Sequence, residues 1–238
     1  LGVGHALAPG WEAFGRVGRS FRAPTVDERI LSTAAYNSFR LRTQTSWDME
    51  TGLRYGGGRW SGEARAWMMN VRDELHFNAA TFLNQNLDPT RRIGVEAEAA
   101  IALARNWSLD VQVAWIRAEF RRGANKGKDL PLVSPWTGSA SLRWQAPSGL
   151  EFAGTVNAVA PKWMDNDDAN RGAKIPGAAL FDARVAGERG PWRGSLQINN
   201  LLDKQYFNYA VASTTTVTTY NAYPLAGRTF RIEVRRAF

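Results

Sequence analysis

The chain of 238 residues has no cysteine and only two histidines, and both scarcities narrow its chemistry. Without cysteine, disulfide frameworks, thiolate metal sites and cysteine nucleophiles are excluded. His5 and His76 alone leave little basis for a zinc site or a histidine base. No segment approaches the roughly 18 uncharged apolar residues that a membrane helix needs, so helical membrane proteins are excluded.

Lysine is also scarce, since only five of the 30 basic residues are lysines and the others are arginines. The formal net charge of +8 would suit a polyanion such as nucleic acid. However, no run of five like charges occurs, and the arginines usually lie within two residues of a carboxylate. We therefore expect paired charges and no nucleic-acid partner.

The first residues, Leu1 to His5, carry none of the features of a signal peptide. Two interpretations follow from this alone: a cytoplasmic protein, or a chain whose N-terminal part is missing. With 44% apolar and 22% charged residues, the chain is not disordered by composition, and its length suits one large domain or two small ones.

Apolar and polar residues alternate with a period of two along most of the chain. Between Trp47 and Tyr55 the odd-numbered residues are apolar or neutral, and the even-numbered ones are charged or glycine. Such alternation is typical of strands with one apolar and one polar face. The chain is therefore predicted to be all-β, with strands at about 1–8, 11–21, 45–55, 59–71, 91–104, 107–120, 136–146, 150–163, 178–187, 192–200 and 228–238.

The connections between these strands alternate strictly in length. Soluble sandwiches mix short and long loops at each end, whereas outer-membrane barrels have tight periplasmic turns and long extracellular loops. The alternation favours an antiparallel transmembrane β-barrel. Short connections lie at 8–10, 56–58, 105–106, 147–149 and 188–191, and long ones at about 22–44, 72–90, 121–135, 164–177 and 201–227.

Aromatic residues mark both ends of the predicted strands, as in the two girdles of a membrane barrel. Every strand that leaves a short turn begins with an aromatic residue, and Tyr55 and Trp144 close strands that arrive at the same side. The starting residues are Trp11, Trp60, Trp107, Phe152 and Trp192, and those at the far ends are Phe21, Trp47, Trp115, Trp136 and Trp163.

Charges of both signs recur on the opposite face of the strands. They would be costly in a soluble core or in lipid, but in a wide lumen they can pair, stay hydrated or contact a polar plug. We expect most of them to form a structural network. They are Glu12, Arg16, Asp48, Glu50, Arg54, Glu63, Arg65, Glu96, Glu98, Asp182, Arg184, Arg231, Glu233 and Arg235.

The last strand alternates up to a terminal phenylalanine and resembles the C-terminal strand recognised by the outer-membrane barrel-assembly machinery. Its alternating residues are Phe230, Ile232, Val234 and Phe238, while Arg236 stands where an apolar or aromatic residue is usual. The resemblance predicts the assembly machinery as a partner.

Five motifs in order resemble the C-terminal part of TonB-dependent outer-membrane receptors, siderophore-receptor type. The first is the family's FRAP box with its following acids, and for it both ligand gating and the shaping of a loop entry stay open. The motifs are Phe21-Arg22-Ala23-Pro24 with Asp27 and Glu28, Met49 to Tyr55, Arg92 to Glu96, Asn199 to Tyr206, and Pro224 to Phe230, in which Leu225-Ala226 replaces a usual proline.

This resemblance implies a multi-pass barrel in the outer membrane of a Gram-negative bacterium, among lipid and lipopolysaccharide. It also implies uptake energised by the TonB–ExbB–ExbD complex, through a plug that fills a 22-stranded barrel. About eleven strands are half of such a barrel. Residues 1–238 are therefore expected to be the C-terminal half of the barrel, with the plug and the first strands missing.

The resemblance favours a ferric siderophore as the solute. Aromatic loop residues can stack on aryl groups while arginine holds their negative charge. Haem is disfavoured because no histidine lies between Arg22 and His76. The candidate substrate-binding residues are Tyr36, Arg40, Trp163, Tyr209, Tyr220 and Tyr223.

Other solutes and functions stay open at this stage. They include cobalamin or another solute, and a passive porin-type barrel without a plug. We expect no cofactor, no metal and no enzymatic activity, since no catalytic arrangement of residues is recognisable. Asp165, Asp167 and Asp168 form either a solvated loop tip or, as hard oxygen ligands, a calcium site.

Overall fold

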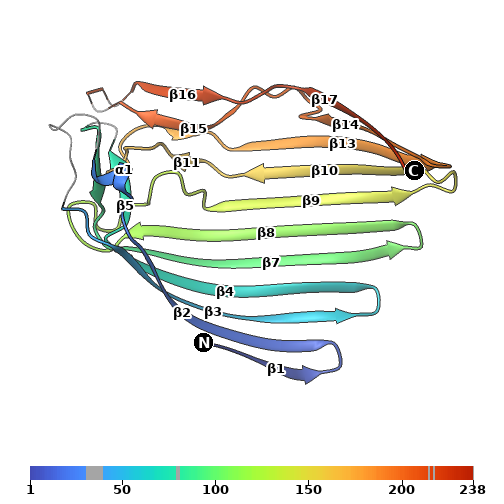
Figure 1. Cartoon of the computed structure of the whole chain (residues 1–238), viewed down its shortest axis with the longest axis horizontal. Helices are drawn as coiled ribbons and strands as arrows, with labels where there is room; N and C mark the ends of the chain where they lie inside the picture. Colours follow the sequence, from blue (N-terminus) through green and yellow to red (C-terminus); the bar gives the residue numbers. More distant parts are fainter. Residues whose placement is uncertain (31–39, 79–80, 214, 217, 238) are drawn as a thin grey trace.

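The computed structural model describes residues 1–30, 40–78, 81–213, 215–216 and 218–237. Eleven strands form one antiparallel sheet and lie side by side in their order along the chain (Figure 1). The strands are β1 (Gly2–Ala8), β2 (Trp11–Arg22), β3 (Gln44–Gly57), β4 (Trp60–Arg72), β7 (Thr90–Ala104), β8 (Trp107–Phe120), β9 (Trp136–Gln145), β10 (Glu151–Val159), β13 (Ala178–Arg189), β14 (Trp192–Asn199) and β17 (Thr229–Arg236).

The predicted all-β class and the predicted strands are confirmed, and most boundaries differ by one or two residues. One prediction is wrong: the strand expected at 150–163 ends at Val159. Pro161 follows it, and proline has no N–H to donate to a strand ladder. Lys162–Trp163 instead forms a separate short strand, β11, beside β12 (Lys174–Ile175).

The long loops fold into small elements at one end of the sheet, drawn at the left of Figure 1. They are the helix α1 (Val26–Arg29), the hairpin of β5 (Leu75–Asn78) with β6 (Leu83–Asn86), the β11–β12 pair, and the hairpin of β15 (Phe207–Ala212) with β16 (Tyr220–Pro224). None of these elements was predicted from the sequence. Among the described residues, no helix is long and apolar enough to cross a membrane.

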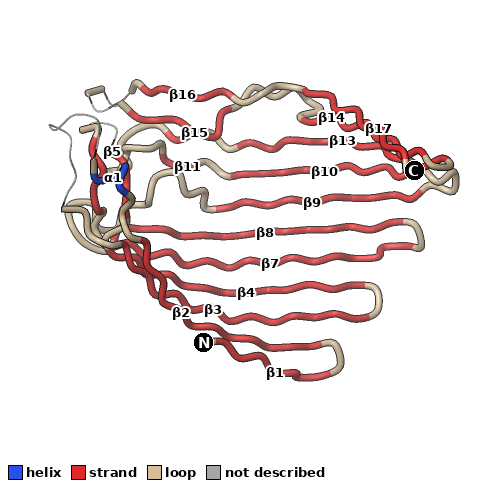
Figure 2. The backbone as a smooth tube through the Cα atoms, viewed as in Figure 1, coloured by secondary structure: helices blue, strands red, loops and turns tan. Residues whose placement is uncertain are grey.

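The sheet is a single layer, with loops only at the ends of its strands (Figure 2). The accessible surface of the chain is 15416 Å², whereas a compact soluble monomer of the same mass exposes about 10,600 Å². Six of the ten buried apolar residues form two small clusters under the loops, Ala118–Phe120–Leu130 and Met164–Ile175–Ala210. The strands therefore carry two exposed faces, which must be covered by something other than this sheet.

Aromatic residues collect on one of these faces, the outer face, at both ends of the strands. At the short-turn end, Tyr55 lies 4.7 Å from Trp11 and 4.0 Å from Trp60 between ring centroids. Farther along the sheet, Trp144 of β9 stacks against Trp107 of β8 and Phe152 of β10. At the loop end, Trp115 and Trp136 are cross-strand partners. The two predicted rows of aromatic residues are thus present, except that Trp163 lies outside the large sheet, in β11.

The sheet ends in two edges, β1 and β17, which lie on opposite sides of Figure 1. Between described residues, no pairing joins them. Exposed strand edges are a liability that closed barrels remove. Between the described residues, the sheet is therefore open along both edges.

Candidate functional site

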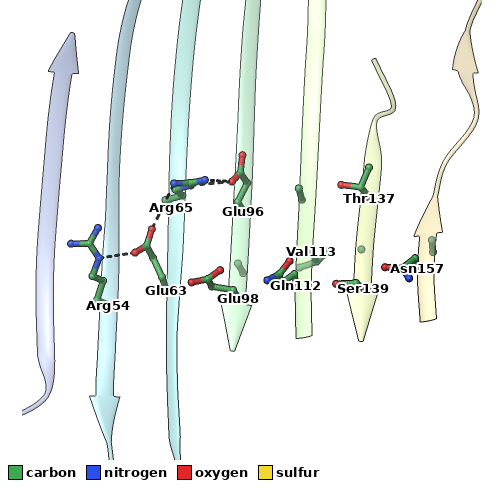
Figure 3. Close-up of a pocket in the computed structure, with 14 residues that line it drawn as sticks. Arg54, Glu63, Arg65, Glu96, Glu98, Gln112, Val113, Thr137, Ser139 and Asn157 are labelled. Carbon is green, nitrogen blue, oxygen red and sulfur yellow. Dashed lines mark hydrogen bonds and ion pairs between the residues drawn. The ribbon is translucent and has the colours of Figure 1, made fainter. Parts of the chain in front are cut away.

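A continuous row of polar side chains crosses the second face of the sheet, which we call the inner face. Cross-strand pairing places its members opposite one another from β2 to β10, and Figure 3 shows most of them side by side. The sequence-predicted polar face is therefore confirmed. The row consists of Glu12, Arg54, Glu63, Glu98, Gln112, Ser139 and Asn157.

Two glutamates organise the charged part of this face. Glu63 accepts a hydrogen bond from Arg54 Nε at 2.6 Å, and its other oxygen lies 3.9 Å from Arg65 Nη1. Glu96 accepts from Arg65 Nε at 3.0 Å (Figure 3). It also accepts from the indole N–H of Trp67 at 2.7 Å. These shared contacts tie β3, β4 and β7 together through side chains as well as backbone.

Glu98 differs from its neighbours, because it sits directly opposite another carboxylate, that of Glu63. Within the described part of the chain it makes no hydrogen bond and no ion pair. It lines a cavity of about 670 Å³ together with Arg54, Arg65 and Gln112. Like charges facing each other across a ladder are destabilising, so this site favours a cation from outside the sheet.

Carboxylates outnumber arginines on the inner face of the first half of the sheet. Two ion pairs at the loop end, Arg22–Glu28 and Arg92–Glu74, are left out of this comparison. The inner face then carries three arginines and six carboxylates on β2, β3, β4 and β7. The later strands carry five of each. The first set is Arg16, Arg54, Arg65, Glu12, Asp48, Glu50, Glu63, Glu96 and Glu98, and the second is Arg143, Arg184, Arg193, Arg231, Arg235, Asp110, Glu151, Asp182, Glu188 and Glu233.

Two strand glycines make room for aromatic rings that support this face. A Cβ at Gly52 would lie 2.6 Å from the Phe14 ring, and the Arg54 guanidinium lies 4.1 Å from the centre of that ring. A Cβ at Gly94 would lie 2.7 Å from the indole of Trp67. At both positions an aromatic ring lies across the strand, and only glycine leaves room for it. The rings in turn pack beside the neighbouring charged side chains.

Three of the predicted substrate-binding residues come together on the β15–β16 hairpin. Tyr209 and Tyr223 are cross-strand partners with ring centroids 5.2 Å apart, and Tyr220 stacks on Phe207. The Tyr209 hydroxyl donates to Asp165 Oδ2 at 2.8 Å. Burial, with that bond to Asp165, raises the pKa of Tyr209 to about 12, so this hydroxyl stays protonated.

The acidic loop packs against this hairpin. His76 Nε2 lies 3.7 Å from Asp165 Oδ1, and Asp167 accepts from the backbone N–H groups of Arg171 and Gly172. Burial raises the pKa of Asp168. In the part of the chain that the structure describes, no three His, Asp or Glu side chains converge to hold a metal ion. The calcium alternative remains an untested prediction.

The other predicted binding residues lie outside the tyrosine hairpin. Trp163 donates its indole N–H to Asp129 at 3.2 Å, and the Lys174 amine lies 4.4 Å from its ring centre. Arg40 is exposed in a turn ahead of β3. Tyr36 lies outside the described residues.

A comparison with known protein families agrees with the antiparallel strand order and with the aromatic outer face and charged inner face of the sheet. A family model described as "TonB dependent receptor-like, beta-barrel" matches residues 1–201. The chain belongs to this family.

Its relatives are distant in sequence and similar in fold. The pesticin receptor of Yersinia pestis is 23% identical over 251 aligned residues, covering 100% of this chain and 35% of that receptor. The ferric yersiniabactin uptake receptor FyuA from Yersinia pestis has a TM-score of 0.78 at 22% identity, covering 100% of this chain and 36% of that one. The copper transporter OprC has a TM-score of 0.80 at 20% identity, covering 99% and 39%. The chain thus spans about a third of the length of these relatives.

In this TonB-dependent receptor barrel, the FRAP box forms the entry to α1. Phe21 and Arg22 end β2, Ala23 follows and Pro24 is buried. Glu28 accepts from the Thr25 N–H at 2.8 Å and pairs with Arg22, and its own N–H donates to the Thr25 hydroxyl. The Thr25 N–H bond and the nearby Arg22 guanidinium hold the pKa of Glu28 below its usual value. Asp27 lies in the first turn, where a negative charge favours the helix dipole.

A second family motif of the receptor barrel closes the turn after β14. Asn200 accepts from the Lys204 N–H and donates to the Lys204 carbonyl, each at 2.9 Å, so side-chain-to-backbone hydrogen bonds close this turn. Asp203 accepts from the Arg228 N–H at 2.7 Å. A Cβ at Gly227 would lie 2.6 Å from Asp203, so this glycine makes room for the carboxylate.

The last strand of the receptor barrel presents Phe230, Ile232 and Val234 on the outer face, where all three are exposed. Phe238 lies outside the described residues. Recognition by the assembly machinery stays a prediction.

Proposed function

We propose that the complete protein is an outer-membrane receptor that imports a scarce solute, a ferric siderophore, with energy delivered through TonB. The observation that carries this proposal is the charged inner face, with its row of polar residues across seven strands and its surplus of carboxylates. A charged face opposite an aromatic-belted one supports a hydrated lumen around a polar occupant.

We further propose that residues 1–238 are the C-terminal half of a 22-stranded barrel. The two unpaired edges, β1 and β17, support this arrangement, because the remaining strands would pair with them. The unpaired Glu98 carboxylate and the negative inner face of β2, β3, β4 and β7 would then contact a plug that carries cations. The TonB–ExbB–ExbD complex would engage the part of the protein outside this chain.

The tyrosine hairpin supports a solute with aromatic or planar groups. Tyr209, Tyr220 and Tyr223 present exposed ring surface at the loop end of the sheet, where a solute would enter. FyuA takes up ferric yersiniabactin and OprC transports copper, according to their names, so an iron chelate and a copper ion are both to be tested. These relatives are receptors and transporters, and we propose no enzymatic activity.

The proposal is tested by uptake in a strain whose own receptors are deleted and which expresses the full-length protein. Radiolabelled ferric siderophores, copper and cobalamin are compared with and without a functional tonB gene. We expect uptake of one ferric siderophore to disappear when TonB is absent. Uptake that persists without TonB would instead identify a passive porin-type barrel.

A further inference from the structure

A second charged cluster lies on the outer face, at the loop end of β7 and β8. Along the outer face of β8, Trp115 is followed by Arg117 and then Glu119 at steps of two residues. Each step advances about 7 Å, so Glu119 lies about 13 Å beyond the tryptophan row. Arg91 on β7 is the direct cross-strand partner of Glu119.

Three guanidinium groups surround the single carboxylate of Glu119. Arg91 and Arg121 approach Oε1 at 2.8 and 3.0 Å, and Arg117 approaches Oε2 at 3.0 Å. The Glu119 side chain is only 8% exposed, whereas those of Arg117 and Arg121 are 59% and 47% exposed. One carboxylate cannot neutralise three arginines, so two positive charges with free donors face outward.

A cavity of about 250 Å³ continues this cluster toward β11 and β12. Its charged lining consists of three cationic residues and one carboxylate, and two tryptophans flank them. Burial lowers the pKa of Lys162. These lining residues are Arg117, Lys162, Lys174, Asp129, Trp115 and Trp163.

The outward direction decides which partner can reach the cluster. Trp115, its partner Trp136 and the exposed Val95 and Val113 share the outer face directly below Arg117. A solute in the lumen contacts the opposite face. A partner here must therefore be an amphiphile, with apolar chains along the valines and an anionic group at the arginines.

We propose that this cluster, Arg91, Arg117, Arg121 and Lys174 around Glu119 and Asp129, binds the phosphate group of a phosphorylated glycolipid in the outer leaflet. Arginine suits this ligand because its planar fork of N–H donors matches two phosphate oxygens at once. The inference rests on the outer-membrane placement proposed above. The ligand is a phosphate carried by a lipid rather than a free anion, because the apolar surface continues the site toward the membrane.

The test uses the full-length receptor in detergent, with bisphosphorylated lipid A as the probe. Native mass spectrometry measures the affinity of the receptor for bisphosphorylated and for dephosphorylated lipid A. It also measures how far inorganic phosphate competes with the lipid. The variant R117A/R121A removes two exposed arginines and leaves Arg91 paired with Glu119, so no buried charge is left unpaired. Arg193→Ala, at the short-turn end of the sheet, is the matched control.

We expect R117A/R121A to bind bisphosphorylated lipid A at least about tenfold more weakly, and Arg193→Ala to bind it as the wild type does. Dephosphorylated lipid A should bind weakly to all three proteins. Equal binding by the double variant overturns the proposal, and so does equal binding of the dephosphorylated lipid. Full displacement by inorganic phosphate at the lipid's own concentration would indicate a soluble anion site instead.

The lipid-binding experiment and the uptake assay can succeed or fail independently of each other. If the wild type binds lipid A through its phosphates but imports no solute in the uptake assay, the transport proposal fails and the lipid site stands. If R117A/R121A loses lipid A while TonB-dependent uptake continues, both proposals hold.

Discussion

Two arginine–glutamate clusters sit on opposite faces of the same few strands. On the inner face of β4 and β7, Arg65 is held by Glu63 and Glu96, and carboxylates are in excess around it. On the outer face of β7 and β8, Glu119 is held by three arginines, and positive charge is in excess. The sign of the excess is the basis of the two contacts proposed above: cations on the inner face, and anionic groups on the outer face.

The largest loss of stability is expected from a substitution at a point on the inner face where no space is left for a larger side chain. Gly52→Val places a side chain 2.6 Å from the Phe14 ring and 2.5 Å from the Ala64 carbonyl. We expect it to destabilise the barrel by about 3 kcal/mol, because a well-packed site cannot expand. The measurement is urea unfolding of the full-length receptor followed by heat-modifiable migration in gels.

Gly154→Val is the matched control, because nothing lies within 4 Å of a Cβ built at this strand glycine. It should unfold within about 0.5 kcal/mol of the wild type. Equal destabilisation by the two variants would contradict the packing explanation.

The next effect separates paired from surplus carboxylates. Glu96→Gln weakens the hold on Arg65 and Trp67, and we expect a loss of about 1 kcal/mol. Glu98→Gln removes a charge that faces Glu63 without a counterion, so the isolated barrel should be unchanged or gain a few tenths of a kcal/mol.

Urea unfolding of the barrel without its plug measures both variants. If Glu98→Gln lowers stability as much as Glu96→Gln does, Glu98 has an intramolecular partner and the inner face has no surplus.

A smaller effect concerns solute binding at the tyrosine hairpin. Tyr209→Ala should weaken binding of the transported solute several-fold, because a stacking ring contributes about 1 kcal/mol. Tyr209→Phe keeps the ring and removes only the hydrogen bond to Asp165, so it should bind nearly normally. Titration calorimetry distinguishes the two, and unchanged affinity in Tyr209→Ala would remove this residue from the site.

The smallest effect is a pH dependence of the α1 entry. The folded-state pKa of Glu28 is lowered, so its stabilising contribution is complete above the unfolded value near 4.5 and is lost as pH falls through the folded value. The protection factor of the Thr25 amide, which is its exchange rate relative to the intrinsic rate at the same pH, should therefore fall at acidic pH. In Glu28→Gln that pH-dependent loss of protection should be absent, and its persistence would assign the effect to another group.

The sequence predicted the sheet far better than the loops, for a physical reason. Period-two alternation is a local signal, and the register follows from it because a slip of one residue would turn Glu63 and Arg65 toward the outer face. The β15–β16 hairpin has no such pattern, since Ala210 is buried by Met164 and Ile175, which are distant in sequence. Alternation likewise extended the β10 prediction past Pro161, where the backbone cannot continue the ladder.

The candidate sites likewise include features that the sequence predicted and features that it did not. Alternation alone located the inner charges, and the outer position of Arg117 and Glu119 was also readable from their odd numbering after Trp115. Their role was missed because Arg91 and Arg121 approach Glu119 only once β7 and the loop after β8 are folded.

The two faces of the sheet are expected to meet different surroundings, water on the inside and lipid on the outside, and spin labels along β9 can distinguish the two. Spin labels are placed singly from Ser139 to Trp144 in the full-length receptor in outer-membrane vesicles, and their collisions with oxygen and with a water-soluble nickel reagent are measured. We expect a period of two, with 139, 141 and 143 more accessible from water and 140, 142 and 144 more accessible to oxygen in lipid. Uniform accessibility, or alternation in the opposite phase, would contradict the account.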